Sequence, residues 1–221
     1  MRRNARPARR LSITCLLFCL AAGATGGCDG GTPLTRPGQA GPQSTFGNDS
    51  SLVSTPVSGE LGAVRGATAR YHDLAVANAD GYVIPAGEPC VAVPPLGVMG
   101  FHAPNLTLMA DQDLDPLRPE LLLYLPKPGG GLKLVGVEYF QNVLLRNLAT
   151  GDVDTWISKD PWDPATYEVA NPTPVLFGRS FDAYHAGHIE SMAWHWDLHV
   201  WVWANNPSGM FAPFNPALTC G

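Results

Sequence analysis

The apolar positions of this chain fall into short runs that proline and glycine residues separate. Three of these runs predict strands, at residues 97–102, 120–126 and 131–140. The sequence KPGGG lies between the last two and favours a hairpin connection. Further strands are predicted within residues 142–148, 153–157, 174–178 and 192–203.

One helical pattern precedes these strands. Between residues 64 and 82 the apolar side chains recur at a helical spacing, and Gly81 stands where a left-handed residue would end a helix. The apolar face consists of Val64, Ala67, Tyr71, Leu74 and Ala75. One N-terminal amphipathic helix followed by many short strands predicts an α+β fold, in which an antiparallel sheet is curled or barrel-like.

Composition divides the chain into three regions. Residues 1–27 combine a basic start with an apolar run and predict a signal peptide. Residues 28–57 are rich in Gly, Pro, Ser and Thr, and predict a flexible tether because they cannot bury enough apolar surface to offset their chain entropy. Residues 58–221 have a length typical of a single globular domain.

The first region indicates export. Its first ten residues hold five arginines and no acid, and the apolar run that follows is shorter than the roughly 20 residues that span a bilayer. Cleavage after Ala24 would release a periplasmic or extracellular protein. Cleavage before Cys28 would produce a lipoprotein, because Thr25-Gly26-Gly27-Cys28 resembles a bacterial lipobox, although leucine is usual at the position of Thr25.

The cysteine count favours lipidation. Cys15 and Cys19 lie in the predicted signal peptide, so three cysteines remain, an odd number for an oxidising compartment. A lipid on Cys28 would anchor the protein in the membrane and leave Cys90 and Cys220 to form a disulfide. The alternative is that these two are buried free thiols.

The charge of the chain argues against nucleic acid as a partner. There are 14 Lys and Arg residues against 19 Asp and Glu residues, and five of the arginines lie in the predicted signal peptide. Nucleic-acid binding depends on clustered cations that neutralise phosphates. The acidic remainder therefore predicts a soluble exported surface.

The sequence HWDLHVWVW, which begins at His195, concentrates chemically useful side chains. In a helix, His195 and His199 would lie one turn apart, as in many zinc sites. Its strict alternation and its Trp and Val content favour a strand instead. In a strand, Asp197 shares a face with both histidines, and the opposite face packs against the core. The two histidine Cα atoms would be roughly 13 Å apart, at the limit for ligating one ion.

Two further residues are candidates for the same site. Glu138 lies in an apolar predicted strand, where alternation places it on one face with Leu134, Gly136 and Phe140. A buried carboxylate is costly unless it is paired or coordinated, so Glu138 needs a histidine or a metal as its partner. Gly136 would let another group approach closely. His102 ends the first predicted strand.

Several ordered motifs resemble an uncharacterised family of exported bacterial proteins and lipoproteins. The motifs are MGFH at 99–102, VEY at 137–139, DLHVWVW at 197–203 and NPSGMF at 206–211. The resemblance covers nearly the whole predicted domain. It implies that His102, Glu138, His188, His195 and His199 occupy motif positions, and it implies no activity.

These residues together predict a metal site. We expect His102, Glu138 and His199 to converge and bind a divalent metal, because two imidazoles and one carboxylate are a ligand set of both zinc and iron. His185 is expected to be a solvated loop residue. The alternative is a hydrogen-bonded network that only fixes the sheet. The residues expected as alternative ligands, or as partners of the ligands, are His188, His195 and Asp197.

Three kinds of function agree with this pattern. The one that we expect is an exported, lipid-anchored domain that binds a metal or a small molecule. A metal-dependent enzyme would use a metal-bound water or oxygen and would need an open coordination position. A structural or interaction lipoprotein would use the same histidines and acids only as hydrogen-bond partners.

Overall fold

The structure is a computed structural model that describes residues 55–188 and 192–221. The predicted signal peptide, most of the predicted tether and the expected lipidation site at Cys28 lie outside the described residues. The first helix, α1 (Thr55–Thr68), begins within the last residues of the predicted tether. None of the helices in the described ranges is long and apolar enough to cross a membrane.

The predicted N-terminal helix is present but is interrupted where its pattern predicted continuity. After α1 the chain forms a 3-10 turn, η1 (Ala69–His72), and then α2 (Leu74–Ala79). The break lies at Asp73, which has an extended backbone and accepts a hydrogen bond from Ala75 N, so that it starts a new helix. Gly81 has the expected positive φ, 95°, just beyond α2.

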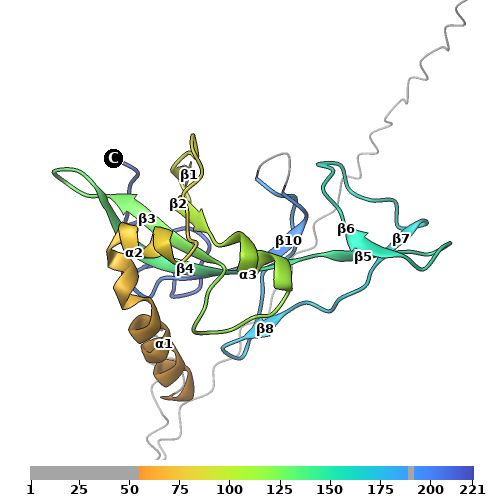
Figure 1. Cartoon of the computed structure of the whole chain (residues 1–221), viewed down its shortest axis with the longest axis horizontal. Helices are drawn as coiled ribbons and strands as arrows, with labels where there is room; N and C mark the ends of the chain where they lie inside the picture. The colour runs from red at the N-terminus through yellow and green to blue at the C-terminus, as the bar shows by residue number, and fades with distance from the viewer. Residues whose placement is uncertain (1–54, 189–191) are drawn as a thin grey trace, which may run out of the picture. The chain divides into compact units, whose positions relative to one another are not determined.

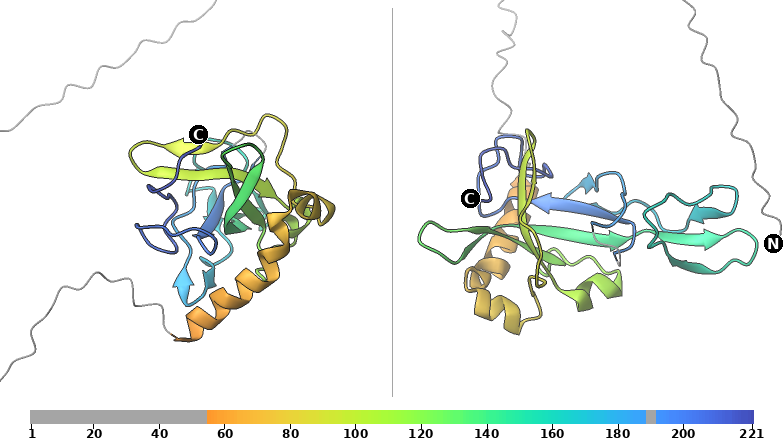
Figure 2. Two further views of the ribbon diagram at one scale, coloured as in Figure 1. Left: turned by 90° about the vertical axis from the view of Figure 1, so that its left-hand side faces the viewer. Right: turned by 90° about the horizontal axis from the view of Figure 1, so that it is seen from above.

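The centre of the fold is a five-stranded antiparallel sheet that curls into a half-barrel (Figures 1 and 2). Its strand order is β1-β2-β3-β4-β10. The α+β class and the curled antiparallel sheet are therefore confirmed. The strands are β1 (Val91–Val93), β2 (Gly97–Pro104), β3 (Leu121–Pro126), β4 (Leu132–Asn142) and β10 (His195–Val200).

Two smaller antiparallel sheets lie between β4 and β10 in the sequence. The strand β5 follows directly on β4 and pairs with β6 on one side and β7 on the other, while β8 pairs with β9 (Figure 1). These strands are β5 (Leu144–Asn147), β6 (Val153–Thr155), β7 (Tyr167–Val169), β8 (Val175–Leu176) and β9 (Arg179–Ser180).

Some short elements were not predicted. The strands β1, β7 and β9 have only two or three residues each, too few to show an alternating pattern. The helix α3 (Leu106–Asp111) was also missed. It begins after Asn105, whose side chain accepts hydrogen bonds from the backbone N–H groups of Thr107 and Leu108. An Asn before an apolar run was therefore a usable signal.

A β-bulge between β3 and β4 decides which side chains of β4 face the candidate site. Leu123 pairs with Gly136, but the next residue, Tyr124, pairs with Leu134, so β4 has one extra residue here. Tyr124 and Leu134 both pack in the larger hydrophobic core, on the face of the sheet that the helices cover. Beyond the bulge the alternation turns Glu138 to the opposite face. The expectation that Leu134 and Glu138 share a face is therefore wrong.

Apolar side chains pack on both faces of the sheet. The larger core joins the helices to one face and includes Val64, Tyr139 and Trp196. A smaller core on the other face includes Leu123 and Trp201. Every residue of β10 is therefore buried, including the histidines and the aspartate, whereas the sequence identified only one face of this strand as core.

The predicted disulfide is present. It joins Cys90 to Cys220, whose Cα atoms are 5.9 Å apart, and it spans a sequence separation of 130 residues. Both cysteines pack against the smaller core. Nearby, Asn215 exchanges backbone hydrogen bonds with Val98 of β2. The disulfide therefore holds the C-terminal segment on the edge of the sheet formed by β1 and β2.

Candidate metal centre

Three side chains from three different strands meet on one face of the sheet. His102 lies on β2, Glu138 on β4 and His199 on β10. Each offers one ligand atom, and these atoms all lie within 4.8 Å of one another. Glu138 Oε2 is 3.3 Å from His102 Nε2 and 3.6 Å from His199 Nε2. We call these three residues the first group of donors. They are the three residues that the sequence analysis expected to converge.

The register of the sheet explains how these residues come together. Glu138 and His199 face each other directly across the β4–β10 pair. His102 reaches them across β3, where it pairs with Leu123 while Glu138 pairs with Leu121. Strands two apart in a flat sheet are about 10 Å apart. The curl of the sheet and the length of the His and Glu side chains close this gap.

Three polar atoms of the first group are buried without hydrogen bonds. Among the described residues, Glu138 Oε2 and both ring nitrogens of His199 are buried without a hydrogen-bond partner. The short contacts with Glu138 are too long or too poorly aligned to count as hydrogen bonds. A buried polar atom without a partner costs roughly 1–3 kcal/mol, so native proteins keep few of them. A bound cation would satisfy Glu138 Oε2 and His199 Nε2 at once, and His199 Nδ1 would remain directed at Asp197.

Burial and charge oppose each other in the first group. Burial raises the pKa of Glu138, but His199 and His102 outweigh this effect and hold the pKa below its ordinary value. Burial likewise lowers the pKa of His102, and the carboxylate of Glu138 outweighs it, so that the pKa is raised. Glu138 is therefore ionised at neutral pH, which is the state that a metal ligand requires.

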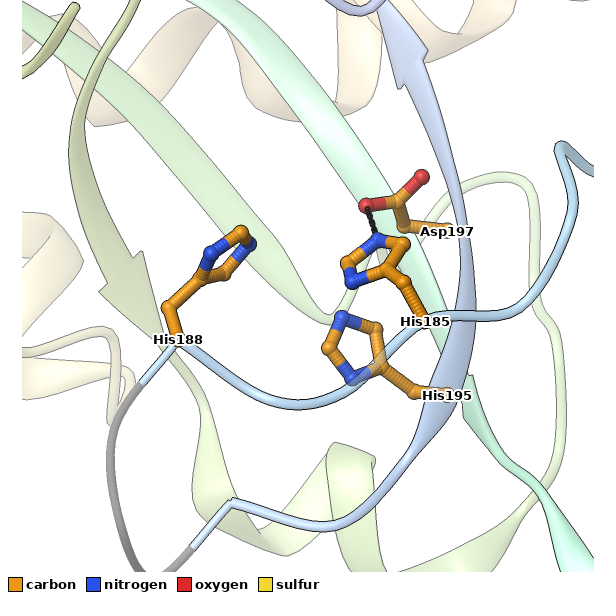
Figure 3. Close-up of side chains that lie close together, drawn as sticks. All are labelled: His185, His188, His195 and Asp197. Atoms are coloured by element: carbon orange, nitrogen blue, oxygen red, sulfur yellow. Dashed lines mark hydrogen bonds and ion pairs between the residues drawn. The ribbon is translucent and has the colours of Figure 1, made fainter. Parts of the chain in front are cut away.

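A second group of donors, shown in Figure 3, contacts the first through His188 and Asp197. It consists of His185, His188, His195 and Asp197, and its four ligand atoms lie within 4.8 Å of one another. His195 and Asp197 alternate along β10, while His185 and His188 come from the loop before it. The backbones of His185 and His195 exchange two hydrogen bonds, of 3.0 and 3.1 Å, which fix the loop against the strand.

The sequence reasoning recognised three of these four residues and missed His185. It assigned His185 to solvent because a His-x-x-His spacing in a loop shows no preferred face. In the structure His185 is half-buried, and its Nε2 is 3.0 Å from Asp197 Oδ2. The usable signal was the spacing itself, which brings His185 and His188 close enough for their ring centroids to be 5.3 Å apart.

The protonation of the second group follows from its contacts. The hydrogen bond to Asp197 raises the pKa of His185 to about 9. Burial lowers the pKa of His195 to about 4 and also lowers that of His188. Burial raises the pKa of Asp197, but the hydrogen bond from His185 and the nearby imidazoles outweigh it and lower the pKa. The carboxylate is therefore ionised, and His195 is neutral at pH 7.

His199 and Asp197 link the two groups. His199 Nε2 faces Glu138, and on the other side of the ring its Nδ1 is 3.9 Å from Asp197 Oδ1. Five of the six histidines in the chain belong to the two groups. The sixth, His72, is exposed and packs edge-on against Trp203, with ring centroids 4.4 Å apart.

Another buried acid, Glu120, lies outside both groups. It is 1% exposed, and its Oε2 accepts a hydrogen bond of 3.1 Å from Phe140 N. Burial raises its pKa to about 8, from an ordinary value of 4.5. Between these two pH values the folded protein keeps a proton that the unfolded chain releases. Stability is therefore expected to fall as the pH rises through this window.

We expect Glu120→Gln to remove this loss. At pH 8 the free energy of unfolding should exceed that of the wild type by roughly 2–4 kcal/mol, and at pH 4.5 the two should be nearly equal. Urea denaturation at both pH values measures the difference. Exposed Glu60→Gln is the matched control and should change neither value. An equal decline with pH in Glu120→Gln would contradict the prediction.

The types of donor atom in the two groups indicate what they could bind. Imidazole nitrogen and carboxylate oxygen are donors that zinc, iron and copper all accept in proteins. The described residues contain two groups of this kind that could hold a metal ion, the first buried and the second partly exposed. No protein-family model, curated protein or solved structure matches the chain. The conclusion from the geometry is therefore a pair of neighbouring His/Glu/Asp clusters able to bind metal.

Proposed function

We propose that the protein binds a divalent metal ion, zinc or iron, through His102, Glu138 and His199, and that it does so outside the cytoplasm. One observation carries the proposal: Glu138 Oε2 and both nitrogens of His199 are buried together without hydrogen-bond partners among the described residues. A protein keeps such atoms at a cost to its stability. A cation bound between Glu138 Oε2 and His199 Nε2 turns the cost at these two atoms into a pair of coordination bonds.

The alternative of a purely structural network is less consistent with the same contacts. In such a network each imidazole N–H would point at an acceptor. The Nε2 atoms of His102 and His199 instead approach the same oxygen of Glu138, at 3.3 and 3.6 Å, and neither contact meets the geometry of a hydrogen bond. Two imidazole nitrogens and a carboxylate oxygen this close together are typical of the ligands of a metal ion.

The disulfide supports the proposed location. Structural disulfides persist mainly in oxidising compartments, such as the periplasm or the extracellular space. The pairing of Cys90 with Cys220 also leaves Cys28 as the remaining cysteine after the predicted signal peptide. We therefore propose that a lipid on Cys28 anchors the protein in a membrane of the cell envelope.

Replacement of Cys28 tests the anchor. We expect Cys28→Ser to move the protein from the membrane fraction to the soluble fraction, because the acylated thiol is lost. Fractionation of cells that express either form, followed by immunoblotting, measures the distribution. Cys90→Ser is the control, since it removes another cysteine but leaves the lipobox intact. An unchanged distribution for Cys28→Ser would exclude the lipid anchor.

A metal-dependent enzyme is the second candidate, and one feature favours it. The first group supplies only three donors, and a three-donor set leaves coordination positions for water or substrate. A metal there would supply an activated water. The burial of all three residues favours binding over turnover, because a substrate would need a path to the ion.

The metal content of the purified protein tests the proposal. Protein without a histidine tag is dialysed against metal-free buffer, incubated with zinc, ferrous iron or cupric ion, dialysed again and analysed by mass spectrometry of the elements. We expect stoichiometric zinc or iron, and we expect isosteric Glu138→Gln to weaken the first site on the order of 100-fold, since it removes a charged ligand. His72→Ala should bind as the wild type does. Wild-type protein that carries no metal and acquires none would end the proposal.

A further inference from the structure

We propose that His185, His188, His195 and Asp197 form a second metal site beside the first, so that the folded protein holds two ions. The inference goes beyond the proposed function, and it rests on that function only for the pairing of the two ions. The second group has its own donors, its own connection to the sheet and its own unpartnered buried atom.

The donor set is complete for a tetrahedral ion. Three imidazoles and one carboxylate fill the four positions of a structural zinc site. Ligand atoms about 2.0–2.1 Å from a tetrahedral ion are roughly 3.4 Å from one another. The four atoms already lie within 4.8 Å of one another, so small side-chain rotations bring them to coordination distance. In Figure 3 the three rings and the carboxylate converge from the loop and the strand.

His195 is held in the tautomer that ligation requires. Its Nδ1 is 2.9 Å from the carbonyl oxygen of Ala193, and a carbonyl only accepts hydrogen bonds, so Nδ1 carries the proton. In the neutral ring Nε2 then bears the lone pair. This atom is buried and has no hydrogen-bond partner among the residues that the structure describes, and the residue is 0% exposed. A backbone carbonyl that orients a histidine in this way is the usual companion of a metal ligand.

His185 shows the same arrangement. Its Nδ1 lies 3.0 Å from the carbonyl oxygen of Ala186, which directs Nε2 at Asp197 Oδ2, 3.0 Å away. If the ring is neutral and Nδ1 carries its proton, a lone pair on His185 Nε2 faces a lone pair on Asp197 Oδ2. Only a proton or a cation between or beside these atoms removes the repulsion. The same two side chains can therefore hold either an ion pair or a metal.

The loop that carries His188 is held close to the strand. A Cβ atom at Gly187 would collide with the Cβ and carbonyl oxygen of Met192, so only glycine permits this approach. Lys159 Nζ also donates a hydrogen bond to the carbonyl oxygen of Gly187. The ring of His188 lies 6.0 Å from that of His195 between centroids, and the residue is exposed. His188 therefore completes the donor set from the solvent side, where an ion can enter.

The two sites are neighbours and share charged groups. The ring centroids of His188 and His102 are 6.3 Å apart, and the Asp197 carboxylate faces the second group with one oxygen and His199 of the first group with the other. Binding at one site therefore changes the field at the other. The second site has four donors and the first has three, so a tightly held ion beside a more open one is expected.

Zinc stoichiometry of matched variants tests the inference. Metal-free protein is titrated with zinc chloride, dialysed and analysed for zinc. We expect two equivalents in the wild type and in His72→Ala, and one equivalent in Glu138→Gln, which alters only the first group. We also expect one equivalent in His188→Ala and in His195→Gln, which alter only the second. Near-UV circular dichroism confirms the fold of each variant, and His188→Ala, an exposed position, keeps the test valid if the buried variant misfolds.

The possible results separate the two proposals. If the wild type binds one equivalent of zinc, and both His188→Ala and His195→Gln still bind it, the second site is overturned and the first site stands. If the wild type binds one equivalent of zinc that Glu138→Gln retains and both second-group variants lose, the second site is supported and the first is overturned. Cobalt(II) gives an independent reading: intense visible absorption typical of four-coordinate cobalt should persist in Glu138→Gln and weaken in His188→Ala.

Discussion

We expect saturating zinc to raise the free energy of unfolding of the wild-type protein, by about 2.7 kcal/mol for each occupied site when free zinc exceeds the dissociation constant 100-fold. The gain arises because the folded protein presents assembled ligands, whereas the unfolded chain does not. In Glu138→Gln the part of the gain that belongs to the first group should disappear. Urea denaturation followed by tryptophan fluorescence, in zinc and in chelator, measures both values.

The comparison of zinc with chelator is the most diagnostic. Without metal, burial raises the pKa of Glu138, but His199 and His102 outweigh this effect and hold the pKa below its ordinary value. The ionised carboxylate therefore stabilises the fold, and its replacement by neutral Gln should lower the free energy of unfolding. If Glu138 served only a structural ion pair, Glu138→Gln would cost the same, about 3–5 kcal/mol, with and without zinc, whereas a metal ligand should make the cost larger in zinc. His72→Ala, outside both groups, should keep the full zinc effect.

Removal of the disulfide is expected to lower the free energy of unfolding by about 4 kcal/mol. The bond joins residues separated by 130 positions, so the reduced unfolded chain gains a large amount of conformational freedom. The double variant Cys90→Ser and Cys220→Ser tests this. The backbone bridge between Asn215 and Val98 remains, so we expect a weaker fold with the same structure.

Equilibrium denaturation of the double variant and of the wild type, each with and without reductant, measures the effect. Reductant should shift the wild type to the denaturation midpoint of the variant and leave the variant unchanged. Equal midpoints for the oxidised wild type and the variant would show that the bond contributes nothing. A zinc effect of the same size in the double variant would show that the disulfide and the metal groups stabilise the fold independently.

Much of this architecture was readable from local pattern. The alternation of bulky and polar residues from His195 onward predicted a strand, and the disulfide followed from an odd number of cysteines after a predicted signal peptide. Glu138 stood out because a carboxylate in an apolar strand needs a partner. Such features depend on residues close in sequence, or on a count, and no knowledge of the pairing between strands is needed.

Other features required long-range contacts. The bulge opposite Leu123 reversed the alternation of β4, and no local pattern marks where a partner strand skips a residue. Gly136 was recognised as a point of close approach, and the structure shows that the approaching group is the backbone of β10, since a Cβ there would lie 2.9 Å from the carbonyl oxygen of Val200.

The second group of donors depends on the same long-range geometry. His185 gained its importance only because its loop pairs with β10 at His195, a contact between segments that the sequence leaves unrelated. Residue types and their spacing were thus sufficient for the longer strands, for the pairing of Cys90 with Cys220 and for the choice of the three residues of the first group. The register, the curl and the loop contact set which of these side chains face each other, because those depend on how distant segments of the chain pack.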